Sequence, residues 1–100
     1  ERTGGICTKA SEYPAWEYTP QSRARDSAVK TYEELTGKKP VISAIHAGLE
    51  CGLIKKLIPD MDAVSFGPYL YDVHTPNEHL SISSVERMWR FTVKLLENMR

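Results

Sequence analysis

The chain has 100 residues, of which 41% are hydrophobic and 26% charged, a composition typical of one soluble globular domain. Its 13 Lys and Arg residues balance its 13 Asp and Glu residues, so the charge predicts no general attraction to nucleic acid or anionic membranes. The apolar runs fall far short of the roughly 20 residues that span a bilayer. With no signal-like N-terminus and only two cysteines, both expected to be reduced thiols, we expect a cytoplasmic protein.

The first residues carry no recognisable start of a domain. The chain begins with Glu1, and its first ten residues hold no helix-capping signal, so we expect a piece of a longer protein. Between residues 6 and 18, scattered aromatic positions are interrupted by Pro14, which suits an edge strand or a bend between strands. We therefore predict a terminal strand that leads into Pro20.

Two helices and an intervening strand are predicted next. Apolar residues recur at helical spacing over residues 22–36, and Gly37 follows where a left-handed helix terminus favours glycine. Pro40 introduces a β-branched run at residues 41–45, typical of a buried strand. A second amphipathic pattern covers residues 49–58, with Gly48 at its entrance and Pro59 at its end.

The last third of the chain repeats the strand and helix signals. Residues 63–66 form a short apolar run before Gly67, followed by a polar and aromatic loop that extends to Ser81. Ser83 and Glu86 match a helix-capping box, so we expect a terminal helix that reaches nearly to Arg100. Its inward face is predicted to consist of seven residues: Val85, Met88, Trp89, Thr92, Leu95, Leu96 and Met99. The order helix-strand-helix-strand-helix predicts the α/β class.

The histidines are the best candidates for metal binding or proton transfer. The chain has three, and His74 and His79 flank the proline-containing segment 75–78. Their five-residue spacing matches neither a helical zinc-protease pair nor a structural zinc finger. Ligand sites of α/β folds usually lie at the carboxyl ends of strands, where His46 and the loop carrying His74 are both expected.

Three ordered blocks of sequence resemble a known family. They are His-Ala-Gly-Leu-Glu-Cys-Gly at residues 46–52, Asp-Ala-Val-Ser-Phe-Gly-Pro at residues 62–68 and His-Thr-Pro-Asn-Glu at residues 74–78. Together they resemble the C-terminal end of the aminoacyl-histidine dipeptidases, which are co-catalytic zinc metallopeptidases. The resemblance implies that residues 1–18 end a lid or dimerisation domain with its linker. Residues 19–100 would then be the C-terminal segment of the mixed-sheet catalytic domain.

The resemblance also implies roles for individual residues. His74 would be a zinc ligand. Because metal-bound histidines usually donate their second ring N–H to a carboxylate or carbonyl, Glu78 is the natural acceptor, and an exposed loop carboxylate is nearly as plausible a reading. His46, Gly48 and Glu50 would border the substrate, unless the glycine turn merely packs helix on strand. The remaining ligands and the general base would lie in the missing N-terminal part, so no catalytic residue is expected within these 100 residues.

The implied activity is hydrolysis of an aminoacyl-histidine dipeptide by a metal-bridging water, in a homodimer that holds a pair of zinc ions, or manganese or cobalt in their place. The isolated chain is expected to be inactive. Two other readings stay open: a non-catalytic folding or association module, and a small metal-binding protein that uses His46, His74 and His79 together. Within the dipeptidase reading, His79 is expected to be a solvated loop residue.

Overall fold

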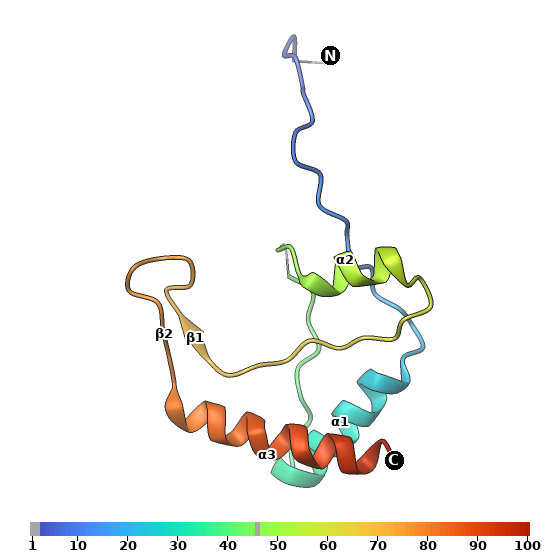
Figure 1. Ribbon diagram of the computed structural model, residues 1–100, viewed down its shortest axis with the longest axis vertical. Helices are drawn as coiled ribbons and strands as arrows, with labels where there is room; N and C mark the ends of the chain where they lie inside the picture. Colours follow the sequence, from blue (N-terminus) through green and yellow to red (C-terminus); the bar gives the residue numbers. More distant parts are fainter. Residues whose placement is uncertain (1–2, 46) are drawn as a thin grey trace.

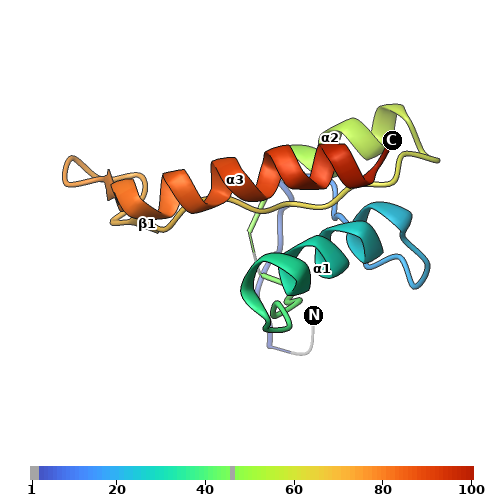
Figure 2. The ribbon, with the colours of Figure 1, turned by 90° about the horizontal axis from the view of Figure 1, so that it is seen from below.

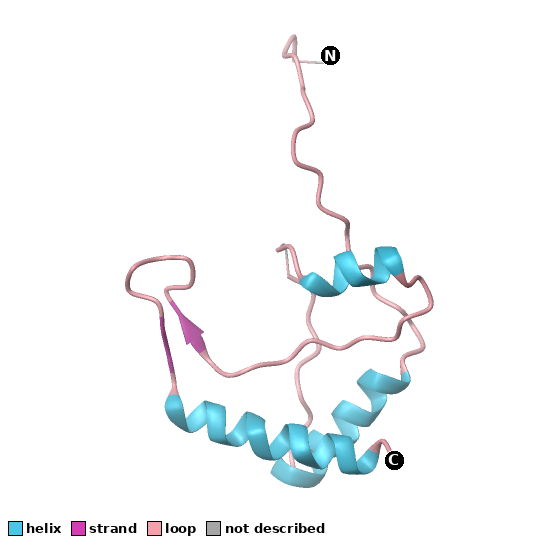
Figure 3. Cartoon of the chain, in the orientation of Figure 1, coloured by secondary structure: helices cyan, strands magenta, loops and turns pink. Residues whose placement is uncertain are grey.

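The structure is a computed structural model that describes residues 3–45 and 47–100. In this part of the chain it contains helices α1 (Arg23–Thr36), α2 (Glu50–Leu57) and α3 (Ile82–Asn98), and strands β1 (Leu70–Tyr71) and β2 (His79–Leu80) (Figures 1 and 3). The two strands form an antiparallel hairpin between α2 and α3. The mixed α/β class predicted from the sequence is therefore confirmed.

Helix α1 begins and ends at the predicted signals. The Ser22 side chain accepts a hydrogen bond from the backbone N–H of Arg25 at 3.0 Å, which satisfies one of the free donors of the first turn. At the other end Gly37 has a φ of 68°, a left-handed conformation that glycine adopts without strain. Local sequence chemistry is sufficient to define this helix.

Helix α3 begins earlier than predicted. Its N-cap is Ser81, whose side chain accepts from the backbone N–H of Ser84, so the prediction that Ser83 and Glu86 cap the helix is wrong. Ser81 is also the residue whose backbone N–H donates to the carbonyl oxygen of Tyr69 at 3.1 Å. The hairpin thus fixes the place where α3 starts, and this constraint is absent from a local capping pattern.

The predicted strands at residues 6–18, 41–45 and 63–66 are wrong within the part of the chain that the structure describes. These segments have no regular secondary structure, whereas the observed strands lie in the segment expected to be a loop (Figure 3). A β-branched apolar run becomes a strand only where a neighbour supplies the ladder of hydrogen bonds. The order of helices is as predicted, but the strands occur in one hairpin rather than between successive helices.

The core lies where α1 and α3 pack against each other (Figure 2). The ring of Phe91 meets Tyr32 edge to face at 6.2 Å between centroids, and meets Phe66 at 4.9 Å. At the C-terminal end of α3, Asn98 Nδ2 donates to Oγ1 of the fully buried Thr31 at 2.9 Å. The buried hydrophobic residues in the described part of the chain are Ala28, Phe91 and Leu95.

Helix α3 has a second apolar face that points to solvent. Of the predicted inward face, Leu95 is buried and Met88 and Thr92 are half-buried, but Trp89 is 68% exposed and Leu96 is 62% exposed. The radius of gyration is 17.4 Å, compared with about 13 Å for a typical domain of this length. The chain therefore buries only a small part of its apolar surface within itself.

The two aromatic residues of α3 give a direct test of this core. We expect Phe91→Ala to destabilise the chain by about 3–5 kcal/mol, because it removes the ring that joins α1, α3 and Phe66. A loss of this size approaches the whole stability of a small domain. Trp89→Ala on the exposed face is the matched control and should change the urea midpoint little. Equal losses in both variants, measured by circular dichroism during urea unfolding, would contradict this description of the core.

Candidate functional site

The hairpin loop between β1 and β2 presents His74. Residues 72–78 join the two strands, and the register pairs Leu70 with Leu80 and Tyr71 with His79. Within the loop, Asp72 has a φ of 50° and His74 a φ of 64°. Both are left-handed conformations that residues other than glycine rarely adopt. The backbone at His74 is therefore held by its surroundings rather than by its own preference.

Thr75 organises this loop. Its hydroxyl donates to the carbonyl oxygen of Asp72 at 2.7 Å, and its backbone N–H donates to the same oxygen at 3.2 Å. The Thr75 hydroxyl oxygen also accepts from the N–H of Asn77 at 3.2 Å, and the Thr75 carbonyl accepts from the N–H of Glu78 at 3.1 Å. These bonds close two successive turns around His74.

Glu78 lies beside His74, but it contacts the backbone. Its Oε2 atom accepts a hydrogen bond from the His74 backbone N–H at 3.2 Å. The bond gives the backbone N–H of His74, a residue in the left-handed conformation, a hydrogen-bond partner within the loop. A contact between the carboxylate and the imidazole ring of His74 stays a prediction.

His79 was expected to be a solvated loop residue, but it lies in β2 and its side chain contacts other residues of the hairpin. Its ring stacks on Tyr71, with 5.1 Å between centroids and 19° between the planes. Its Nδ1 atom donates to the carbonyl oxygen of Asn77 at 2.8 Å and lies 3.7 Å from Oδ2 of Asp72. The sequence signal that could have revealed this role is an aromatic residue opposite His79 on a neighbouring strand.

The glycine turn before α2 packs against the N-terminal segment. A Cβ atom at Gly48 would lie 3.0 Å from the ring of Tyr13, and one at Gly52 would lie 2.8 Å from the carbonyl oxygen of Pro14. Glu50 is exposed in the first turn of α2, and His46 lies outside the described residues. Figures 1 and 2 show α2, which begins at Glu50, and the hairpin, whose loop carries His74, as separate parts of the molecule.

The described side chains of this chain can supply a single metal ligand, but they do not form a complete metal site. Across residues 3–45 and 47–100, no group of three or more His, Cys, Asp or Glu side chains could hold a metal ion. A structural zinc site needs four ligands and a catalytic one at least three protein ligands. The exposed imidazole of His74 suits zinc as a single donor, so the other donors would have to come from elsewhere.

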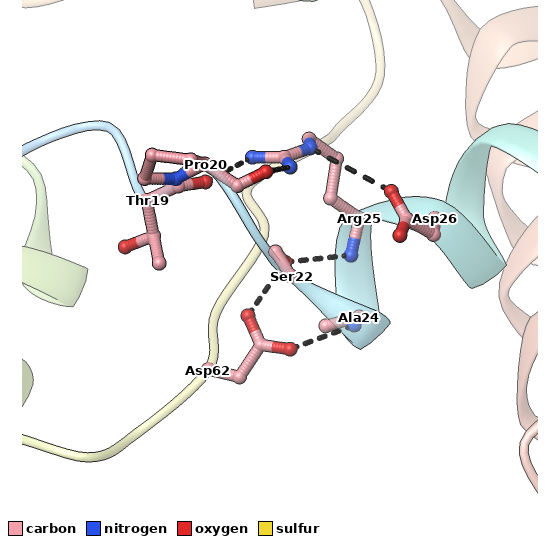
Figure 4. A network of polar contacts seen from close by, with 7 residues as sticks. All are labelled: Thr19, Pro20, Ser22, Ala24, Arg25, Asp26 and Asp62. Atoms are coloured by element: carbon pink, nitrogen blue, oxygen red, sulfur yellow. Dashed lines mark hydrogen bonds and ion pairs between the residues drawn. The ribbon is translucent and has the colours of Figure 1, made fainter.

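The segment that leads to the hairpin is anchored at both ends. At its start, Asp62 accepts a hydrogen bond from the Ser22 hydroxyl at 2.6 Å and from the backbone N–H of Ala24 at 2.8 Å (Figure 4). At its end, the N–H of Tyr69 donates to the Ser84 hydroxyl at 2.9 Å. The hairpin is thereby tied to α1 and to α3.

The Asp62 carboxylate is stabilised in its charged form. The hydrogen bond from the Ala24 N–H, followed by that from the Ser22 hydroxyl, holds the pKa of this carboxyl below its ordinary value. A negative charge at this position also interacts favourably with the N-terminus of α1.

Arg25 binds the segment 18–20, which precedes α1. Its guanidinium donates to the carbonyl oxygens of Thr19 at 2.6 Å and Pro20 at 2.7 Å (Figure 4). The guanidinium carbon also lies 4.7 Å from the centre of the Tyr18 ring. The planar fork of arginine allows it to bind both carbonyls at once. The segment 18–20 therefore has a defined path beside α1.

The fold is similar to part of a solved dipeptidase. The crystal structure of an aminoacylhistidine dipeptidase from Vibrio alginolyticus matches 85% of this chain with a TM-score of 0.78 and 45% sequence identity. The match covers 17% of that protein. No protein-family model matches the chain.

A curated relative gives the same result. The cytosol non-specific dipeptidase of Escherichia coli strain K12 is 42% identical over 99 residues, which is 98% of this chain. The chain spans 20% of the length of that relative. The resemblance to the aminoacyl-histidine dipeptidases is confirmed along nearly the whole chain, and both of these relatives are dipeptidases.

The Asp62 contacts lead to a pH-dependent prediction. Because the folded-state pKa is lowered, ionised Asp62 stabilises the fold above the ordinary pKa of the carboxyl in the unfolded chain, and this contribution is lost as the pH falls through the folded value. Asp62→Asn should lower the urea midpoint at neutral pH and have a vanishing effect in strong acid. Asp60→Asn, at an exposed position two residues away, is the control. A difference between Asp62→Asn and the parent chain that persists in strong acid would contradict this role.

Proposed function

We propose that this chain is the C-terminal segment of a zinc-dependent dipeptidase that hydrolyses aminoacyl-histidine dipeptides. The observation that carries the proposal is the 42% identity to a bacterial dipeptidase over 98% of this chain. The chain spans 20% of the length of that dipeptidase. The compact, hydrogen-bonded loop around His74 supports it, because a metal ligand must be presented in a defined orientation. Dipeptide hydrolysis is then an activity of the full-length polypeptide.

His74 is the proposed metal ligand. Bound zinc would supply a metal-bridging water with a lowered pKa, which side chains alone do not provide. The proposed role of this chain is to hold the His74 imidazole in place. Glu78 contributes to this role by accepting a hydrogen bond from the His74 backbone N–H. The proposed native cation is zinc, with manganese or cobalt as substitutes, and the remaining ligands and the general base would come from other parts of the full-length polypeptide.

The turn before α2 is the proposed border of the dipeptide pocket. Leu49 caps α2 without a side-chain hydrogen bond, and of the first-turn N–H groups that of Gly52 donates to the Leu49 carbonyl oxygen at 2.9 Å. His46, Gly48 and Glu50 precede or begin this helix and would contact the polar ends of the substrate. The close packing of Gly48 on Tyr13 fixes the path of the turn.

The wider assignment follows the same proposal. Residues 1–18 would end the lid or dimerisation domain, and the full-length protein would be a cytoplasmic homodimer that takes part in proteolysis. None of the helices among the described residues combines the length and the apolar character of a membrane-spanning segment.

Substitution of the histidines in the full-length polypeptide tests the function. We expect His74→Ala to lose one bound zinc equivalent and most dipeptide hydrolysis, because an imidazole donor is removed. His46→Ala is the matched comparison and should keep the zinc while it raises KM for the dipeptide. Zinc content by elemental analysis and turnover are the measurements, with the isolated 100-residue chain as an inactive control. Full zinc content in His74→Ala, or turnover by the isolated chain, would refute the proposal.

The exposed apolar surface favours a second candidate, a non-catalytic association module. Val41 is 91% exposed and Trp89 is 68% exposed, and such residues in an isolated chain favour self-association. If association is the function, sedimentation should show a dimer that Trp89→Glu converts to a monomer. A monomer at all concentrations would exclude this candidate and leave the dipeptidase proposal in place.

A further inference from the structure

The hairpin is too short to hold its own loop by backbone pairing. Each strand has two residues, and both are exposed along their whole length. An isolated two-stranded hairpin is at most marginally stable in water. Yet its loop keeps Asp72 and His74 in left-handed conformations. Contacts other than the strand ladder must therefore maintain this geometry.

His79 supplies the contact that joins the two sides of the loop. Its ring covers Tyr71 on the opposite strand at 5.1 Å, and its Nδ1 atom donates to the carbonyl oxygen of Asn77 at 2.8 Å. Asp72, the first left-handed residue, lies 3.7 Å from the same nitrogen. One side chain thus connects strand β1, the start of the loop and the end of the loop.

The other bonds of the loop are local. The Thr75 bonds reach three residues back and three forward, and Glu78 binds the backbone four residues before it. They shape the turn but do not attach it to β1. The stacked pair of Tyr71 and His79 is what relates the turn to the strands, because cross-strand aromatic pairs stabilise a hairpin beyond its backbone bonds.

We propose that His79 is a positioning residue, which together with Tyr71 holds the hairpin loop in the conformation that presents His74 to a metal ion. This inference rests on the proposed function, in which His74 is a zinc ligand. It gives a role to a histidine that is not itself a ligand. Groups that orient a metal ligand typically change metal affinity by about 10–100-fold when removed.

Variants in the full-length polypeptide separate the two contacts of His79. We expect His79→Ala to raise the Kd of the zinc ion bound by His74 by about 10–100-fold, measured by competition with a chelator. His79→Phe keeps the stack and His79→Asn keeps a donor near the Asn77 carbonyl, so each should fall between the parent and His79→Ala. Tyr71→Phe preserves the ring and is the matched control, with an affinity close to the parent.

The visible spectrum of the cobalt(II)-substituted protein provides a readout other than activity. We expect His79→Ala to change this spectrum, because the imidazole of His74 would approach the metal from an altered loop, and Tyr71→Phe to leave it unchanged. The unfolding midpoint should stay near that of the parent, since the hairpin is exposed. A variant that does not fold is replaced by His79→Asn, for which a smaller change in the same direction is expected.

The outcomes distinguish this inference from the function on which it rests. If His74→Ala keeps its zinc and its cobalt spectrum, the proposed function fails, and the inference fails with it. If His74→Ala loses the metal while His79→Ala and His79→Asn match the parent in Kd and spectrum, the positioning role alone is overturned. A raised Kd with a changed spectrum in His79→Ala, alongside an unaffected Tyr71→Phe, supports it.

Discussion

The edge-to-face packing of Phe91 is the interaction on which the described structure depends. This single ring contacts Tyr32 of α1 and Phe66 of the segment that leads to the hairpin, so it joins three parts of the chain that are distant in sequence. The buried hydrophobic core around it is small. Polar contacts at the margins, from Asp62 to α1 and from Asn98 to Thr31, complete the attachment. The remaining elements take their positions from this junction.

The hairpin depends on the junction through α3. Its base is hydrogen-bonded to the first turn of that helix, where Ser81 donates to the Tyr69 carbonyl and Ser84 accepts from the Tyr69 N–H. Within the loop, the threonine and glutamate bonds set the conformation of His74. The site is thus built from a helix and a locally bonded loop, rather than from the carboxyl ends of successive strands as the sequence predicted.

The helices could be predicted from the sequence because their signals are local. Ser22 and Gly37 bound α1, and Pro59 follows the end of α2, so periodicity and capping residues were sufficient. The strands could not, since residues 41–45 and 63–66 have the composition of buried strands but lack a paired neighbour in the described chain. Three ordered sequence blocks led to the dipeptidase resemblance, which the comparisons confirmed. The stacking of His79 on Tyr71 was missed because the segment up to Ser81 was predicted to be a loop, so no strand register paired the two rings.

Helix α3 is long, and the base of the hairpin that carries His74 is hydrogen-bonded to its first turn. Its 17 residues extend over about 26 Å, and Asn98 fastens the far end to α1. The Phe91 contact lies about 14 Å from the first residue of the helix, so a tilt of roughly 4° about this contact would displace the hairpin by about 1 Å, which exceeds the tolerance of a well-ordered metal site. A change in the position of α3 would therefore also move the loop that carries His74.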